Sequence, residues 1–283
     1  MKIDKRQLNK LKSLHKRLYN VKEILANTNG KDKYAFAPCF VGKDYLSQNR
    51  RLMIIGQNSN GWDRDDGKFS NADEYAEYIV NTYMDPTASN YEGFNWIETL
   101  DNTGYHINSS SFWKPATAIY KSFSGLNDVN IWQHYTVQSD TMKITYHKNS
   151  IGNVVDRDSS KNELSEITVQ KDISLKILLQ EIEILKPTHI LFMTNDNADT
   201  YFFSTLNEMF GELPKEFEKD RTVERQIVKR FGMIGDSKCI VTIHPSGLYV
   251  PGNQIEKYIK EIDRASSFMG WDFFKKEFER IIS

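Results

Sequence analysis

Two short polar segments, far apart in the chain, each follow an apolar run that predicts a β-strand. The first is Gly56 to Gly61 (Gly-Gln-Asn-Ser-Asn-Gly), and the second is His244 to Leu248 (His-Pro-Ser-Gly-Leu). If their strands belong to one parallel sheet, both segments lie at its carboxyl edge, where α/β proteins bind ligands. An imidazole and a carboxamide at such a site suit cleavage of a bond whose leaving group is planar and becomes anionic.

The elements that must position these segments alternate between strands and helices. This alternation predicts an α/β fold, a three-layer α/β/α sandwich with a short, mostly parallel central sheet covered on both faces. Residues 31–50 are expected to be irregular. We expect strands at 51–55, near 142–146, at 189–193 and at 239–243. We expect helices at 4–26, 72–83, from a cap at Ser110 or Ser111 to about 120, 173–185, within about 198–230, 254–265 and 271–282.

The first helix, at about 4–26, is amphipathic and basic. Its apolar positions recur at helical spacing, and most of its charged residues are Lys or Arg. One interpretation is a solvated surface on a helix that covers the core. The other is a contact with the backbone of a nucleic acid.

Length and composition limit the class of protein. The 283 residues, 39% of them hydrophobic, predict one domain over 1–283, with the basic helix at its start. Cys39 and Cys239 are too few for a disulfide framework, a four-thiolate zinc site or an iron–sulfur cluster, so we expect no metal. The charged amino terminus and the lack of a long apolar run predict a cytoplasmic protein without a membrane partner.

The two segments together resemble the uracil-DNA glycosylase superfamily. In that family the first loop is Gly-Gln-Asp-Pro-Tyr-His, or begins Gly-Met-Asn-Pro or Gly-Ile-Asn-Pro in two branches, and the last loop is His-Pro-Ser followed by an intercalating segment. Here the corresponding runs are Gly-Gln-Asn-x-x-Gly and His-Pro-Ser-x-Leu. The Ser-Phe-Trp helix start at 111–113 and the Leu-Lys-Pro run at 185–187 also fit.

The resemblance implies a catalytic role for two residues. His244 would donate a hydrogen bond from a neutral imidazole to the departing pyrimidine. Asn58 stands where family members carry Asp or Asn; as an amide it cannot act as a base, so it would orient the attacking water. Gly56 and Gln57 would contribute to substrate binding, Gln57 mainly through its backbone amide. As plain turn residues, Asn58 could form an Asx-turn and His244 could end a strand.

The resemblance also implies a DNA interface after the second strand. Leu248 would enter the space left by the flipped nucleotide, and Tyr249 could add stacking. The preceding turn would bring backbone amides to a phosphate; its residues are Pro245, Ser246 and Gly247.

The base pocket is less defined by sequence. Phe69 is the expected aromatic that stacks on the flipped base, with Trp62 and Phe94 as competitors. The family's base-reading asparagine, expected at the end of the second sheet strand, has His147 and Asn149 as its nearest polar candidates. Ser59 and Asn60 replace the family residues that exclude a 5-substituent, so a bulkier base than uracil can fit.

These observations predict a monofunctional DNA glycosylase that flips out uracil or a modified pyrimidine and leaves an abasic site. A role in base-excision repair, or in defence against phage with modified DNA, would follow. We expect DNA as partner, no cofactor, a monomer, and a location at the nucleoid of a prokaryote. Two alternatives stay open: a DNA-binding protein on the same fold that has lost catalysis, and an α/β enzyme acting on free nucleotides. The first glycine loop is followed by Trp62, not Lys-Ser or Lys-Thr, which disfavours a phosphate-loop NTPase.

Overall fold

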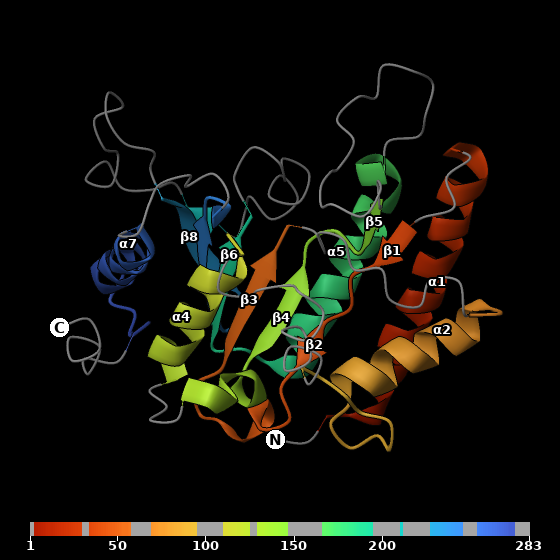
Figure 1. Ribbon diagram of the computed structural model, residues 1–283, viewed down its shortest axis with the longest axis horizontal. Helices are drawn as coiled ribbons and strands as arrows, with labels where there is room; N and C mark the ends of the chain where they lie inside the picture. Colours follow the sequence, from red (N-terminus) through yellow and green to blue (C-terminus); the bar gives the residue numbers. More distant parts are fainter. Residues whose placement is uncertain are drawn as a thin grey trace. The chain divides into compact units, whose positions relative to one another are not determined.

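The computed structural model of the chain describes residues 3–29, 34–57, 69–94, 110–124, 129–146, 166–194, 210–211, 227–245 and 254–274. Helices and strands alternate along much of this part of the chain (Figure 1). In chain order the helices are α1 (Lys5–Asn29), α2 (Ala72–Ile79) with its π-helical continuation η2 (Val80–Met84), α4 (Trp113–Ser124), α5 (Glu166–Leu185) and α7 (Gln254–Phe268), and the 3-10 helices are η1 (Tyr45–Ser47) and η5 (Val129–Tyr135). The strands are β1 (Tyr34–Phe36), β2 (Phe40–Val41), β3 (Leu52–Gly56), β4 (Val137–Asp140), β5 (Ile144–Tyr146), β6 (His189–Met193), β7 (Phe210–Gly211), β8 (Val228–Ile234) and β9 (Ser237–Thr242).

The main sheet has the strand order β2-β4-β3-β6-β9-β8-β7. Strands β3, β6 and β9 are parallel, with Ile55 level with Phe192 and Phe192 level with Val241. Strands β8 and β7 extend the sheet in antiparallel fashion, and β1 pairs with β5 in a separate two-stranded sheet. The protein is thus of the α/β class with a mostly parallel central sheet, as the sequence predicts, and this arrangement fits a three-layer α/β/α fold.

The chain divides into two compact units, each built from separate stretches. Unit 1 comprises Met1–Val41, Gln57–Gly93 and Ser139–Lys186. Unit 2 comprises Gly42–Gly56, Phe94–Gln138 and Pro187–Ser283. The prediction of one domain over 1–283 stays a prediction.

Unit 1 is organised around α1. Its leucines at positions 8, 11, 18 and 25 are all buried, because a spacing of three or seven residues places them on one face of the helix. The neighbouring helix α2 begins at an Asn71 cap, whose side chain accepts hydrogen bonds from the backbone N–H groups of Asp73 (3.0 Å) and Glu74 (2.9 Å). The expected helices at 4–26 and 72–83 are therefore present.

Unit 2 contains the three parallel strands. Every residue of β3 and β6 is buried, which is why, after His189 at the start of β6, both strands are continuous apolar runs rather than alternating ones. Ser110 caps helix α4: its Oγ accepts a hydrogen bond from Trp113 N at 3.2 Å. This confirms one of the two caps that the sequence offers. Within the described ranges, no helix combines the length and the apolar character needed to cross a membrane.

Several expectations about secondary structure were wrong. Residues 31–50, expected to be irregular, contain β1 and β2, and the expected helical region at 198–230 contains β7 and the start of β8. Strand β8 returns along β9 through a tight turn at Gly235, which has a left-handed φ of 57°, so its pairing partner is adjacent in the chain. Residues 271–274, expected to be helical, are not. Gly270 follows the end of α7 with a left-handed φ of 65°, and the Arg50 guanidinium donates hydrogen bonds to the carbonyls of Asp272 (2.6 Å) and Phe273 (2.5 Å).

Candidate functional site

His244 follows the end of β9, and the backbone that leads to it is held by hydrogen bonds. The N–H of Ile243 donates to the carbonyl of Ile227 at 2.9 Å. The Tyr258 hydroxyl, from α7, donates to the carbonyl of Ile243 at 3.1 Å and is also hydrogen-bonded to the hydroxyl of Thr242. The residue before the histidine is therefore fixed from both sides.

The imidazole of His244 is half-buried and packs against the start of α4. Its ring stacks on Phe112, with a centroid separation of 6.1 Å and an angle of 23° between the planes. Phe112 in turn meets Trp113 edge-on at 5.2 Å. Burial lowers the pKa of His244 from its usual 6.5 to about 4. At neutral pH the ring is thus uncharged, and it offers one N–H donor and one acceptor nitrogen.

Helix α4 runs from the carboxyl edge of the parallel strands to their amino edge. Phe112, at its start, packs on His244, whereas Phe123, near its end, packs on His189, the first residue of β6. Twelve helical residues cover about 18 Å, close to the length of a five-residue strand. The positive end of the α4 dipole therefore lies at the same edge as His244, where it favours negative charge on a ligand.

Three parallel strands of unit 2 end together at this edge. Gly56 ends β3, Thr194 follows β6, and His244 follows β9 beyond Ile243. Since β6 lies between the other two strands, β3 and β9 are about 10 Å apart. Thr194 is fully buried, and its hydroxyl has no hydrogen-bond partner within the described part of the chain. The edge thus combines a neutral imidazole, a buried hydroxyl and a helix amino terminus.

Gln57, the second residue of the first motif, belongs to unit 1. Its carbonyl accepts two hydrogen bonds, from the Thr141 hydroxyl at 2.9 Å and from the Met142 N–H at 3.1 Å. Sequence reasoning missed both donors. Asn58 lies outside the described residues, so the expectation that it shares one cleft with His244 stays a prediction.

The strand next to β3 differs from the one expected. It is β4, which ends at Asp140, whereas the expected strand near 142–146 corresponds to β5, which pairs with β1. The polar residues that end the strand beside β3 are consequently Asp140 and Thr141. His147 and Asn149 lie outside the described residues. All four residues of β4 are buried although three are polar, so hydropathy does not reveal the strand.

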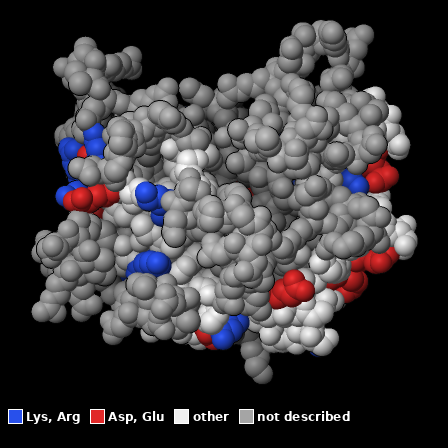
Figure 2. Space-filling model, in the orientation of Figure 1, with Lys and Arg blue, Asp and Glu red and all other residues white. Residues whose placement is uncertain are grey.

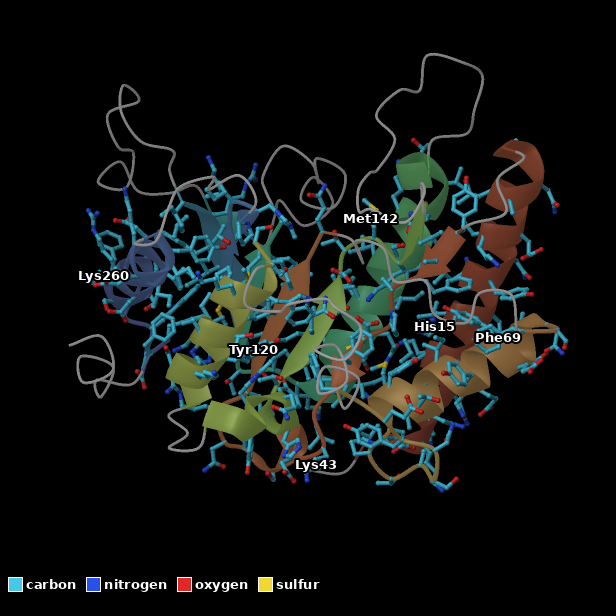
Figure 3. All side chains as sticks on the ribbon, in the orientation of Figure 1. His15, Lys43, Phe69, Tyr120, Met142 and Lys260 are labelled. Atoms are coloured by element: carbon cyan, nitrogen blue, oxygen red, sulfur yellow. The ribbon has the colours of Figure 1, made fainter. Side chains whose placement is uncertain are left out.

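Phe69 lies in an aromatic cluster of unit 1 (Figure 3). Its ring is 5.5 Å from that of Tyr75 and 5.1 Å from that of Tyr78, and its carbonyl accepts a hydrogen bond from Tyr19 at 3.2 Å. These contacts explain its position without a ligand. Its stacking on a flipped base stays a prediction.

Two basic side chains of α1 are paired with acidic side chains of α2. Lys12 contacts Glu77 at 2.5 Å, and Lys16 is paired with Asp73, both on α2. The hydrogen bond from Lys12 lowers the pKa of Glu77. Acidic side chains over α2 are visible on the face shown in Figure 2. This pairing favours the solvated-surface interpretation of the basic helix over a contact with nucleic acid.

Of the residues expected to contact DNA, Pro245 is described, and it is buried directly after His244. The others lie outside the described residues; they are Ser246, Gly247, Leu248 and Tyr249. Comparison of the sequence with protein-family models gave no match, and comparison with curated proteins gave none either.

Proposed function

We propose that this protein is a monofunctional DNA glycosylase, which hydrolyses the N-glycosidic bond of uracil or of a modified pyrimidine and leaves an abasic site. One observation carries the proposal. The neutral, partly buried imidazole of His244 follows β9, the last of three parallel strands, and the Gly-Gln-Asn motif follows β3, the first of them. Each motif thus follows the strand after which the uracil-DNA glycosylase superfamily, which the sequence resembles, has its corresponding motif.

The chemistry needs a donor for the leaving base. When the bond between C1′ and the base nitrogen breaks, both electrons stay with the pyrimidine, and negative charge develops on its ring and carbonyl oxygens. A neutral imidazole N–H hydrogen-bonded to such an oxygen stabilises this charge, and the dipole of α4 adds to the effect. Water, oriented by Asn58, forms the new bond to C1′, and its proton passes through solvent to the pyrimidine anion, which leaves as the neutral base.

The base excised is a pyrimidine that can carry a 5-substituent. Ser59 and Asn60 stand where the resembled family has residues that exclude such a group. A modified pyrimidine, such as one from phage DNA, is therefore as good a candidate as uracil. Repair and defence remain the two settings that this activity would serve.

The test uses labelled oligonucleotides that contain uracil, hydroxymethyluracil or glucosylated hydroxymethylcytosine. Alkali cleaves the strand wherever a base has been removed. We expect product from at least one of them, and a large loss of rate in His244→Ala and in Asn58→Ala. His134→Ala serves as the matched control, since it removes another half-buried histidine from unit 2. Rates like those of the wild type in both site variants would refute the assignment.

The same experiment separates the two alternatives. DNA binding that weakens steeply with salt, without a cleaved strand, would favour a DNA-binding protein that has lost catalysis. The replacement of the family's proline by Ser59 motivates that alternative. Turnover of free nucleotides without action on the polymer would favour a nucleotide enzyme.

A further inference from the structure

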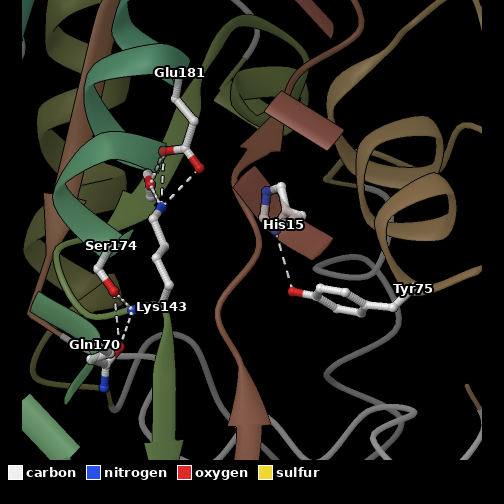
Figure 4. A network of polar contacts seen from close by, with 7 residues as sticks. His15, Tyr75, Lys143, Gln170, Ser174 and Glu181 are labelled. Atoms are coloured by element: carbon white, nitrogen blue, oxygen red, sulfur yellow. Dashed lines mark hydrogen bonds and ion pairs between the residues drawn. The ribbon is translucent and has the colours of Figure 1, made fainter. Parts of the chain in front are cut away.

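A buried polar network in unit 1 links α5 to the segment 139–144. Three polar residues of α5 point toward this segment: Gln170, Ser174 and Glu181. They are spaced by four and seven positions, so they lie on one face of the helix. Figure 4 shows Lys143 reaching from the segment to this face.

The charged part of the network is fully enclosed. Lys143 Nζ donates to both carboxylate oxygens of Glu181 at 2.9 Å and to Ser139 Oγ at 2.5 Å, and Ser139 in turn donates to Glu181 at 2.7 Å. The side chains of Lys143 and Glu181 are 0% exposed. A buried ion pair tolerates little displacement, because each charge depends on its partners for the solvation it has lost. The pair therefore holds the segment in one arrangement.

A second set of bonds holds the backbone of the same segment. Gln170 Oε1 accepts from the N–H groups of Lys143 (2.9 Å) and Ile144 (2.8 Å), and its Nε2 donates to the carbonyl of Ile144 at 2.6 Å. The Gln170 side chain thus satisfies backbone N–H and C=O groups that a neighbouring strand would otherwise pair with. Ser174 donates to Gln170 Oε1 at 3.0 Å and keeps the amide in this orientation.

The residues between the two anchored positions contact the first motif. Thr141 and Met142 lie between the anchored residues Ser139 and Lys143, and they supply the two hydrogen bonds to the Gln57 carbonyl. We propose that the network positions this carbonyl, and with it the peptide group from which the chain continues to Asn58. In this proposal, which rests on the proposed function, Thr141 is a positioning residue for base excision.

Such an anchor has a physical purpose. A water-orienting amide must be held to within roughly 0.5 Å, and a displacement of about 1 Å can cost a hundred-fold in rate. Gln57 is the last described residue before Asn58. Fixing its carbonyl with two donors sets the direction in which the chain leaves the sheet.

The chain offers a matched pair of variants. Thr141 holds the residue just after β3, whereas Thr188 holds Arg51, just before β3, accepting from its N–H at 2.8 Å and donating to its carbonyl at 3.1 Å. Thr141→Val and Thr188→Val each remove a threonine hydroxyl that bonds to the chain at one end of the strand. We expect Thr141→Val to lower kcat for excision about ten-fold or more with KM within about two-fold, and Thr188→Val to keep the wild-type kcat. Thr141→Ser, which keeps the hydroxyl, should restore the rate.

Equal kcat values in Thr141→Val and Thr188→Val would overturn the positioning proposal. A second measurement decides it even if the wild-type protein removes no base. Thr141→Val should speed hydrogen exchange at the Met142 amide, which shares the Gln57 carbonyl, and Thr188→Val should leave that amide unchanged. Unchanged exchange in Thr141→Val would overturn the positioning role. A wild-type protein that is inactive on every oligonucleotide would instead reject the proposed function.

Discussion

Removing one charge of the buried Lys143–Glu181 pair should destabilise the protein far more than removing both. Lys143→Met leaves the Glu181 carboxylate without its partner, and Glu181→Gln leaves the Lys143 ammonium without its partner. Both side chains are 0% exposed to solvent, so water cannot replace the lost charge. Each single change should lower the free energy of unfolding by about 3–5 kcal/mol. In the double variant neither charge remains, and the new glutamine can still accept the hydrogen bond from Ser139.

The magnitude follows from burial, and an exposed pair provides the control. Lys10 and Glu183 are 3.6 Å apart, with side chains 64% and 54% exposed, so Lys10→Met should change the free energy of unfolding by less than about 1 kcal/mol. The two lysine variants remove the same charge and differ in the solvation of the carboxylate that is left.

Urea denaturation followed by tryptophan fluorescence and by circular dichroism measures these differences. We expect the double variant Lys143→Met/Glu181→Gln to be less destabilised than either single variant. Two results would refute the reasoning: a cost for Lys143→Met as small as that of Lys10→Met, or a double variant whose loss equals the sum of the single losses.

Two further predictions concern pH. With a pKa of about 4, His244 stays neutral over the range of an ordinary assay, so kcat for excision should show no inflection near pH 6.5; a profile with one there would contradict the neutral donor. Burial, with a smaller effect of Lys143, lowers the pKa of His15 from 6.5 to about 3. Between these values the unfolded chain binds a proton that the folded protein does not, so this contribution to stability is complete above pH 6.5 and is lost as pH falls toward 3. The free energy of unfolding from urea denaturation should therefore decline less steeply with acid in His15→Gln than in the wild type, by up to about 1.4 kcal/mol per pH unit; parallel curves would argue against a neutral His15.

The periodicity of apolar residues was sufficient to predict some of the regular elements, but not β1, β2, β4 or β8. The strand 189–193 was placed at its observed bounds, and α1 and α4 were found because leucine spacing and a serine cap are local signals. Local sequence also located His244 at the end of a strand. It did not indicate the stacking on Phe112 or the burial that keeps the imidazole neutral, because both depend on a helix more than a hundred residues away.

What only the tertiary structure decided is how polar residues are used inside unit 1. Strand β4 does not look like a strand in sequence, since Gln138, Ser139 and Asp140 are hydrophilic, and Lys143 after it is charged. They are buried because partners from α5, 27 to 42 positions along the chain, satisfy Ser139 and Lys143. A hydrophobic residue signals its own burial through its low affinity for water. A polar residue becomes stable in the core only where the fold brings a matching donor or acceptor to it. That partner is distant in the sequence, so the adjacent residues do not predict it.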